Sequence, residues 1–312
     1  MLKDFDNGIF LLQGKKSSNI YFIRGKDGII IDTGHPHQAK ENLNVLKDFG
    51  LFPSDVKYII NTHSHPDHVG GNVEFLNYFS NAKIINSIKT QPYLAKKKQY
   101  ALYEDIEDVA DTYPIHIEVK DCECLESGNT KIKFIETPGH TVDSISIEIN
   151  EEFLFSGDTL YQNIVPQVDY YDDLPESLSL LKATYNKLAT KNYKKVFPGH
   201  GNPFDNLGKV FAMLKRKTDK FTDNPLLLLV NTICPLLELY FKKFPGKTTD
   251  EILPIFNEYL NRPVSANFWP TFKDTDFNDT VEKALFLMKA MNMITINDNG
   301  RIFLTGELNE HL

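Results

Sequence analysis

The chain has 312 residues, of which 41% are hydrophobic and 24% are charged. This composition is sufficient for a packed core and excludes a disordered chain. The length exceeds that of one average domain, so we predict a large domain over residues 1–207 and a smaller one over residues 208–312. The formal net charge is −8. A nucleic-acid partner is therefore disfavoured, because an acidic surface does not attract phosphate backbones.

The sequence also bears on location. The N-terminus carries Asp4 and Asp6 and lacks the basic-then-apolar pattern of a secretory signal. The longest apolar run, residues 225–230, is far shorter than the roughly 20 residues that span a membrane. The chain has three cysteines, an odd number without a disulfide framework. We expect a cytoplasmic protein with no membrane partner.

Short apolar runs alternate with helical patterns up to about residue 200. Strands are predicted at residues 8–12, 20–24, 28–32, 56–61, 82–86, 115–119, 131–136, 144–149, 153–156 and 195–197. Helices are predicted at residues 39–49, after Gly71, and at residues 94–110 and 176–189. Strands interleaved with helices in two similar rounds predict an α/β fold in which helices cover layered sheets.

The remaining residues give a mainly helical pattern. Helices are predicted at residues 226–241, 250–260 and 280–291, and two strands at residues 293–296 and 301–304 flank a turn that ends at Gly300. Three helices followed by a hairpin have the order of a winged helix, so we predict a small winged-helix-like domain. From Lys209 onward there are 13 basic and 13 acidic residues, so this region is electrically neutral.

A histidine-rich loop follows the predicted strand at residues 56–61. It reads THSHPDHVGG over residues 62–71 and contains His63, His65, Asp67 and His68. In an extended segment, the side chains of His63 and His65 point the same way, while Asp67 and His68 begin the next turn and face a second point. One loop can thus supply ligands to two metal ions. Imidazole and carboxylate ligands suit zinc, with iron or manganese as alternatives.

Three later motifs place a ligand-type residue beside a glycine just past a predicted strand. They contain His140, Asp158 and His200, and Asp32 stands in a similar context after an earlier strand. Functional groups collect on loops at strand ends, where a rigid sheet positions them. The alternative is that these histidines lie on the surface by chance, but chance does not account for all of these motifs in one chain. By contrast, we expect His35 and His37 to flank a helix start at the surface.

In their order, these motifs resemble those of the metallo-β-lactamase superfamily, which has HxHxDH, a later histidine, a bridging aspartate and a final histidine. The resemblance covers about residues 8–203 and implies a four-layer αββα sandwich with the site at one edge of two sheets. It implies one metal ion bound by His63, His65 and His140, and a second bound by Asp67, His68 and His200, with Asp158 bridging both. Asp32 resembles the aspartate that orients a ligand histidine in this family.

Such a site predicts hydrolysis. Two divalent ions about 3.5 to 4 Å apart share a hydroxide and polarise the substrate oxygen. We expect this bridging hydroxide to attack the carbonyl of an ester, thioester or lactone, with Asp67 or a metal-bound water taking the proton. Tyr161 stands three residues after Asp158, an offset at which the lactonase branch of the superfamily carries a tyrosine that resembles an oxyanion donor. Tyr161 is therefore a second candidate catalytic residue, or else an aromatic packed under the site.

Three readings of the whole chain remain open. The first is a hydrolase of small acyl substrates; glyoxalase II is similar at residues 62–71 and 157–160, but residues 161–166 lack its Gly- and Cys-containing segment. The second is a lactamase-like endoribonuclease or phosphodiesterase that uses the C-terminal domain for RNA, against which the neutral tail argues. The third makes the tail an interaction module that walls the pocket or forms a homo-oligomer. Residues 170–173 are expected to form a lid.

Overall fold

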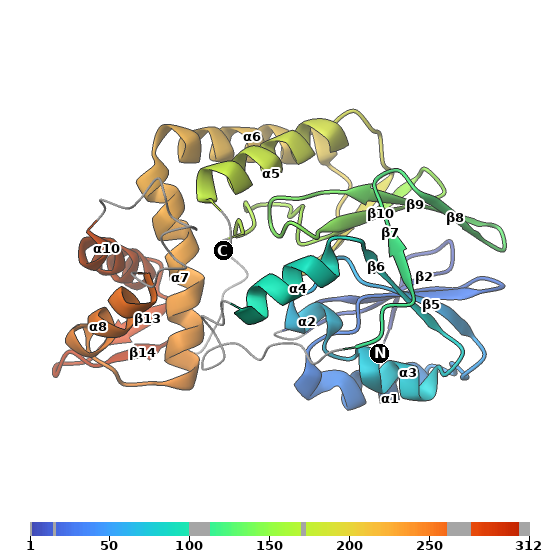
Figure 1. Cartoon of the computed structure of the whole chain (residues 1–312), viewed down its shortest axis with the longest axis horizontal. Coiled ribbons are helices and arrows are strands. Elements are labelled where there is room, and N and C mark those ends of the chain that lie inside the picture. The colour runs from blue at the N-terminus through green and yellow to red at the C-terminus, as the bar shows by residue number, and fades with distance from the viewer. Residues whose placement is uncertain (1, 15–16, 100–112, 170–172, 261–275, 306–312) are drawn as a thin grey trace.

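The computed structural model describes all residues except 1, 15–16, 100–112, 170–172, 261–275 and 306–312. Two sheets lie face to face between layers of helices, and further helices form a separate lobe beside them (Figure 1). This is the αββα arrangement predicted from the sequence.

The first sheet has seven strands, which lie across the sheet in chain order. They are β1 (Lys3–Asp4), β2 (Ile9–Leu12), β3 (Ile20–Ile23), β4 (Gly28–Ile31), β5 (Val56–Ile60), β6 (Lys83–Ser87) and β7 (Ile117–Val119). Strands β1 to β4 form an antiparallel meander, whereas β4 to β7 are parallel. Parallel strands need crossover helices. Helices α1 (Ala39–Asp48) and α3 (Asn72–Tyr78) fill this role and bury Leu46 and Phe75 against the outer face of the sheet.

The second sheet has five strands in the order β12-β11-β10-β9-β8. They are β8 (Cys124–Ser127), β9 (Thr130–Glu136), β10 (Ile145–Ile149), β11 (Phe153–Gly157) and β12 (Lys195–Pro198). Helix α5 (Leu174–Leu188) links β11 to β12, the one parallel pair of this sheet. Its buried side chains pack with Leu154 and Val196 on the outer face.

The core between the two sheets follows from the alternation of side chains along each strand. Leu154 faces the outer helices, while the next residue, Phe155, faces the other sheet. The Phe155 ring stacks on Phe197 with ring centroids 4.7 Å apart, and Tyr21 of the first sheet meets Phe155 at 5.1 Å. These aromatic contacts join the two sheets.

Most predicted elements are present, and the differences have local causes. Strand β8 was not predicted, because its largely exposed sequence CLES has no apolar alternation. Two short helices, η1 (Pro36–Gln38) and α2 (Pro66–Val69), were also not predicted. The helix expected at residues 94–110 begins earlier, as α4 (Thr90–Gln99), and its second half lies outside the described residues. The lid expected at residues 170–173 is described only at Asp173, whose side chain caps α5.

The C-terminal region is helical and ends in a hairpin, in the predicted order. Its elements are α6 (Leu207–Asp223), α7 (Pro225–Lys243), α8 (Thr249–Leu260), α10 (Phe277–Ala290), β13 (Ile294–Ile296) and β14 (Ile302–Leu304). Helix α6 was not predicted as an element of its own. The described residues do not establish a winged helix, which remains a prediction. Buried residues of α7, α8 and α10 belong to the same hydrophobic cluster as those of α5.

Helix α7 is apolar over a greater length than the run at residues 225–230 indicated. The apolar run at residues 225–230 is short, but the helix continues to Lys243, and by length and composition alone it could cross a membrane. In the structure, 65% of its apolar stretch is buried inside the protein. A mostly buried apolar helix is what the core of a helical lobe requires, so this burial accounts for its composition.

The inter-sheet aromatic cluster should dominate stability. We predict that Phe155→Ala, which empties a fully buried ring site, lowers the free energy of unfolding by about 3 to 5 kcal/mol. Phe52, which is 66% exposed, is the matched control, and Phe52→Ala should change the free energy of unfolding by less than about 0.5 kcal/mol. Chemical denaturation monitored by circular dichroism measures both. Equal effects would contradict the assignment of the core.

Candidate metal centre

The predicted ligand residues all follow strands that end at one edge of the sandwich. In the first sheet, β4 and β5 are parallel, so Asp32 and the histidine loop leave the same edge. In the second sheet, β10 is antiparallel to both β9 and β11, and β11 is parallel to β12. Strands β9, β11 and β12 therefore point the same way, and His140, Asp158 and His200 follow their ends. Strand direction alone brings these distant segments together.

The structure gathers all seven predicted metal ligands. Three sets have ligand atoms within 4.8 Å of one another: His63, His65 and His140; His63, His68 and Asp158; and Asp67, His68 and His200. The first and third sets are the two trios that the motifs predicted, and Asp158 lies between them, 3.7 Å from His140 of the first and 3.2 Å from His68 of the other. Their roles as ligands remain predictions, but the arrangement has two adjacent points of convergence.

Hydrogen bonds behind the rings decide which nitrogen faces the centre. Thr62 donates its hydroxyl proton to Asp32 at 2.9 Å, so its oxygen can only accept the Nδ1 proton of His63, at 3.1 Å. The Nδ1 of His140 donates to the carbonyl oxygen of Gln167 at 2.7 Å. The Nε2 atoms of His63 and His140 therefore present lone pairs to the centre, as metal ligation requires.

Buried polar atoms without partners test whether a metal pair fits. His63 Nε2, His68 Nε2 and Asp158 Oδ1 are buried and make no hydrogen bond of regular geometry, and the last two face each other as an ion pair at 3.2 Å. Unpaired buried polar atoms are costly. The Nε2 lone pair of His140 also faces the Nδ1 of His65 at 3.1 Å. Ring nitrogens and carboxylate oxygens that converge mainly on one another suit divalent cations with borderline nitrogen and oxygen ligands.

Asp32 holds the histidine loop in place. Its carboxylate accepts hydrogen bonds from the backbone N–H of Thr62 at 2.8 Å and from the Thr62 hydroxyl, and it lies 2.8 Å from His68 Nδ1. The predicted contact between Asp32 and a ligand histidine is thus present. Its φ of 58° is in the left-handed region, a conformation retained at about 1 to 3 kcal/mol where the surroundings demand it.

Several residues that support the site were not singled out from the sequence. Tyr21 donates to the carbonyl of Pro198 at 2.7 Å, and Asn19 donates to the carbonyls of Pro198 and Gly201 at 3.0 and 2.9 Å. These bonds fix the loop that carries His200. Thr62 and the backbone of Gln167 orient histidines in the same way. The polar residues Asn19 and Tyr21 beside an apolar strand were the available signal.

The glycines of the site allow the backbone to approach neighbouring atoms closely. A Cβ at Gly199 would lie 2.1 Å from Asp158 Oδ1, and one at Gly70 would lie 2.1 Å from Pro36. Gly70 and Gly71 have φ of −63° and −88°, which any residue adopts. Space, and not an unusual backbone conformation, therefore requires glycine at these positions.

The two candidate catalytic residues both reach the centre. Asp67 Oδ2 lies 3.1 Å from His200 Nε2. Burial opposes its charge, but His68 and His200 outweigh burial and hold the pKa of Asp67 well below its usual range. Burial, followed by the nearby Asp158 carboxylate, raises the pKa of Tyr161. At neutral pH, Asp67 is a carboxylate and Tyr161 a hydrogen-bond donor.

The two remaining N-terminal histidines do not join the described metal trios. His35 precedes η1, and its side chain accepts a hydrogen bond from the backbone N–H of His37 at 3.3 Å. Their position at a helix start agrees with the sequence expectation.

The fold and the histidine-aspartate centre define a metal-dependent hydrolase. The sequence model of the metallo-β-lactamase superfamily matches residues 14–200, and the chain belongs to this superfamily.

Three curated relatives carry related activities in their names. A Beta-lactamase-like protein 2 homolog of Caenorhabditis elegans is 30% identical over 64% of this chain and 59% of its own length. A probable metallo-hydrolase of Methanocaldococcus jannaschii is 31% identical over 64% of this chain and 94% of its own length. A hydroxyacylglutathione hydrolase of Pelagibacter ubique is 29% identical over 55% of this chain and 70% of its own length. The chain thus spans less than two thirds of the first of these relatives.

Solved structures extend the likeness in fold. A β-lactamase domain protein from Burkholderia ambifaria has a TM-score of 0.60 at 16% identity and covers 97% of this chain and 94% of its own. At this identity the likeness concerns the fold alone. Its coverage includes the C-terminal helices.

The charges of the centre predict how metal binding depends on pH. Burial alone would lower the pKa of His200, but Asp158 and Asp67 raise it to about 10, and Asp158 and Asp32 raise the pKa of His68 against burial. Both rings hold protons at pH 7 in the metal-free chain, and a metal ion must displace them. Zinc affinity should therefore fall as pH falls, by up to about tenfold per pH unit for each proton displaced. Calorimetric titrations in two buffers of different protonation enthalpy measure this release; heats independent of the buffer would contradict it.

Proposed function

We propose that the chain hydrolyses a small ester, thioester or lactone, breaking the bond between the carbonyl carbon and its oxygen or sulfur substituent, with the help of two divalent ions. Zinc is the first candidate, and iron and manganese suit the same ligands. The observation that carries this proposal is the convergence of two ligand trios on Asp158, with the Tyr161 ring beside them, its centroid 6.4 Å from that of His200, and its hydroxyl kept uncharged by burial and by the Asp158 carboxylate, which raise its pKa. An uncharged donor at the centre suits a carbonyl oxygen that becomes negative during the reaction.

The ions, when bound, supply positive charge and a water of lowered pKa. The residues of the chain do the rest. Asp32, Thr62 and the Gln167 carbonyl hold the imidazoles so that the Nε2 atoms of His63, His68 and His140 face the centre. The ionised carboxylate of Asp67 accepts a proton, and the Tyr161 hydroxyl donates to the substrate oxygen as charge develops on it.

The relatives support an acyl substrate. The name of the Pelagibacter relative denotes hydrolysis of an acylated glutathione, which is a thioester. Residues 161–166 of this chain read YQNIVP and differ from the corresponding glyoxalase II segment, so glutathione itself is not part of the proposal.

A second candidate, hydrolysis of RNA phosphodiesters, is favoured by one feature. Arg216, Lys217 and Lys220 lie together on α6, and Lys217 donates to the carbonyl of Asn163 at 2.7 Å, two residues beyond Tyr161. Burial and then the neighbouring Arg216 and Lys220 lower the pKa of Lys217. A cationic cluster near the centre would suit a phosphate backbone.

A substrate panel separates the two candidates. The zinc-loaded chain should hydrolyse thioesters or lactones, lose this activity on chelation and recover it with metal, and leave single-stranded RNA intact. The matched control is Lys217→Gln, which should leave acyl hydrolysis unchanged. RNA cleavage that falls steeply with salt and weakens in Lys217→Gln, without acyl turnover, would establish the second candidate instead.

The role of Tyr161 has a direct test. Tyr161→Phe keeps the ring beside His200, whose centroid is 6.4 Å away, and removes only the hydroxyl. We expect kcat/KM for the best acyl substrate to fall by roughly 10², with two metal ions still bound. An unchanged kcat/KM would mean that Tyr161 is only packed under the site.

A further inference from the structure

The segment at residues 165–169 connects to the loop that carries His140 by three backbone and side-chain contacts. The Gln167 carbonyl accepts the Nδ1 proton of His140 at 2.7 Å. The backbone N–H of Asp169 donates to the Gly139 carbonyl at 3.0 Å, and the Asp169 carboxylate accepts from the Val142 N–H at 3.2 Å. These contacts bracket His140 on both sides.

Asp169 is buried, with 4% of its surface exposed, and also accepts a hydrogen bond from the Tyr93 hydroxyl of α4 at 3.3 Å. Its two carboxylate oxygens therefore link α4, the 165–169 segment and the His140 loop. A buried carboxylate held by several donors is a rigid joint, because losing any one donor leaves a charge poorly solvated. The position of the Gln167 carbonyl depends on this joint.

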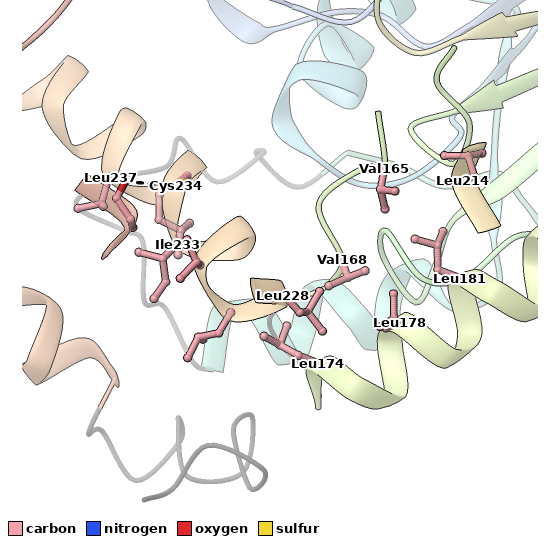
Figure 2. Close-up of a cluster of buried hydrophobic side chains, with 14 of the residues drawn as sticks. Val165, Val168, Leu174, Leu178, Leu181, Leu214, Leu228, Ile233, Cys234 and Leu237 are labelled. Atoms are coloured by element: carbon pink, nitrogen blue, oxygen red, sulfur yellow. Dashed lines mark hydrogen bonds between the residues drawn. The ribbon is translucent and has the colours of Figure 1, made fainter. Parts of the chain in front are cut away.

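The other side of the segment faces the C-terminal helices. Val168 is 1% exposed and lies in one cluster with Leu174 of α5 and Leu228 of α7 (Figure 2). Helices α5 and α7 are in contact. Leu228 stands in the first turn of α7, so the beginning of the C-terminal lobe packs where the segment passes.

We propose that Asp169 is a positioning residue for His140 and that α7, through Leu228 and Val168, braces the segment that orients this ring. The C-terminal helices would then set how tightly the His63, His65 and His140 trio holds its metal ion. The inference rests on the metal centre of the proposed function. It makes metal affinity a property of the lobe's packing, so a ligand or partner that shifts α7 would change occupancy of one metal position.

The first test measures zinc affinity by competition with a chelator. Asp169→Ala should lower the affinity for one of the two zinc ions by about 10- to 100-fold. Asp169→Asn, which keeps one acceptor oxygen, should lower this affinity less. The double variant Asp169→Ala/His140→Ala should bind no more weakly than His140→Ala, because both changes act on one ion. Asp32→Asn, which acts through His68 and, by way of Thr62, through His63 and not through His140, should instead add to the effect of His140→Ala. Additive effects of Asp169→Ala and His140→Ala would overturn the proposal.

The second test separates bracing from general stability. Leu228 and Leu237 are both buried in α7, 1% and 0% exposed, and Leu237 lies far along the helix from Val168 (Figure 2). Both truncations to Ala should lower the unfolding midpoint, but only Leu228→Ala should weaken zinc binding, by roughly tenfold. If Leu228→Ala does not fold, Leu228→Val takes its place with a smaller expected effect.

The outcomes distinguish this inference from the proposed function. Equal zinc affinity in the Leu228 and Leu237 variants, with two ions bound to the wild-type chain, would overturn the brace and leave the hydrolase proposal intact. A wild-type chain that binds no metal would overturn both.

Discussion

The buried carboxylate of Asp32 is the contact on which the centre depends. It is 2% exposed, lies at the end of β4 and accepts from the backbone and hydroxyl of Thr62 while it touches the His68 ring. A charge in that position must be fully hydrogen-bonded, because an unpaired buried charge costs several kcal/mol. Satisfying it fixes the start of the histidine loop. His63 is then oriented through Thr62, so one carboxylate aligns rings that belong to both ligand trios.

The sheet supplies the direction of the other ligand loops, and contacts from neighbouring segments fix the His140 and His200 loops in position. Strands β9, β11 and β12 run the same way, and their loops leave at the edge where β4 and β5 end. Close approach of backbones then brings the loops within bonding range, and Gly199 makes this approach feasible beside Asp158. Edge-on contacts of Tyr21 with Phe155 and Phe197 join the two sheets and keep both edges in register. Core packing and chemistry are thus parts of one structure.

The C-terminal helices do not stand apart from this arrangement. Their buried side chains share a cluster with α5 and with the segment that holds His140. The likeness to a solved β-lactamase domain protein also runs through nearly the whole chain. A hydrophobic face shared between two regions makes their folding and their motions interdependent. The lobe therefore bears on the metal centre even if it never touches a substrate.

The sequence by itself determined the ligand types, their order and most strands, because metal ligation needs particular side chains and buried strands need apolar alternation. The seven candidate ligands, of which His63 is the first and His200 the last, could be listed from the motifs alone. What only the tertiary structure decided was orientation: the Gln167 carbonyl behind His140, Tyr21 and Asn19 behind the His200 loop, and Leu228 beside the 165–169 segment. These contacts join residues far apart in the chain through backbone atoms or ordinary apolar groups. Neither kind of contact can be recognised in a single sequence, because every residue has a backbone carbonyl and leucines occur throughout protein cores.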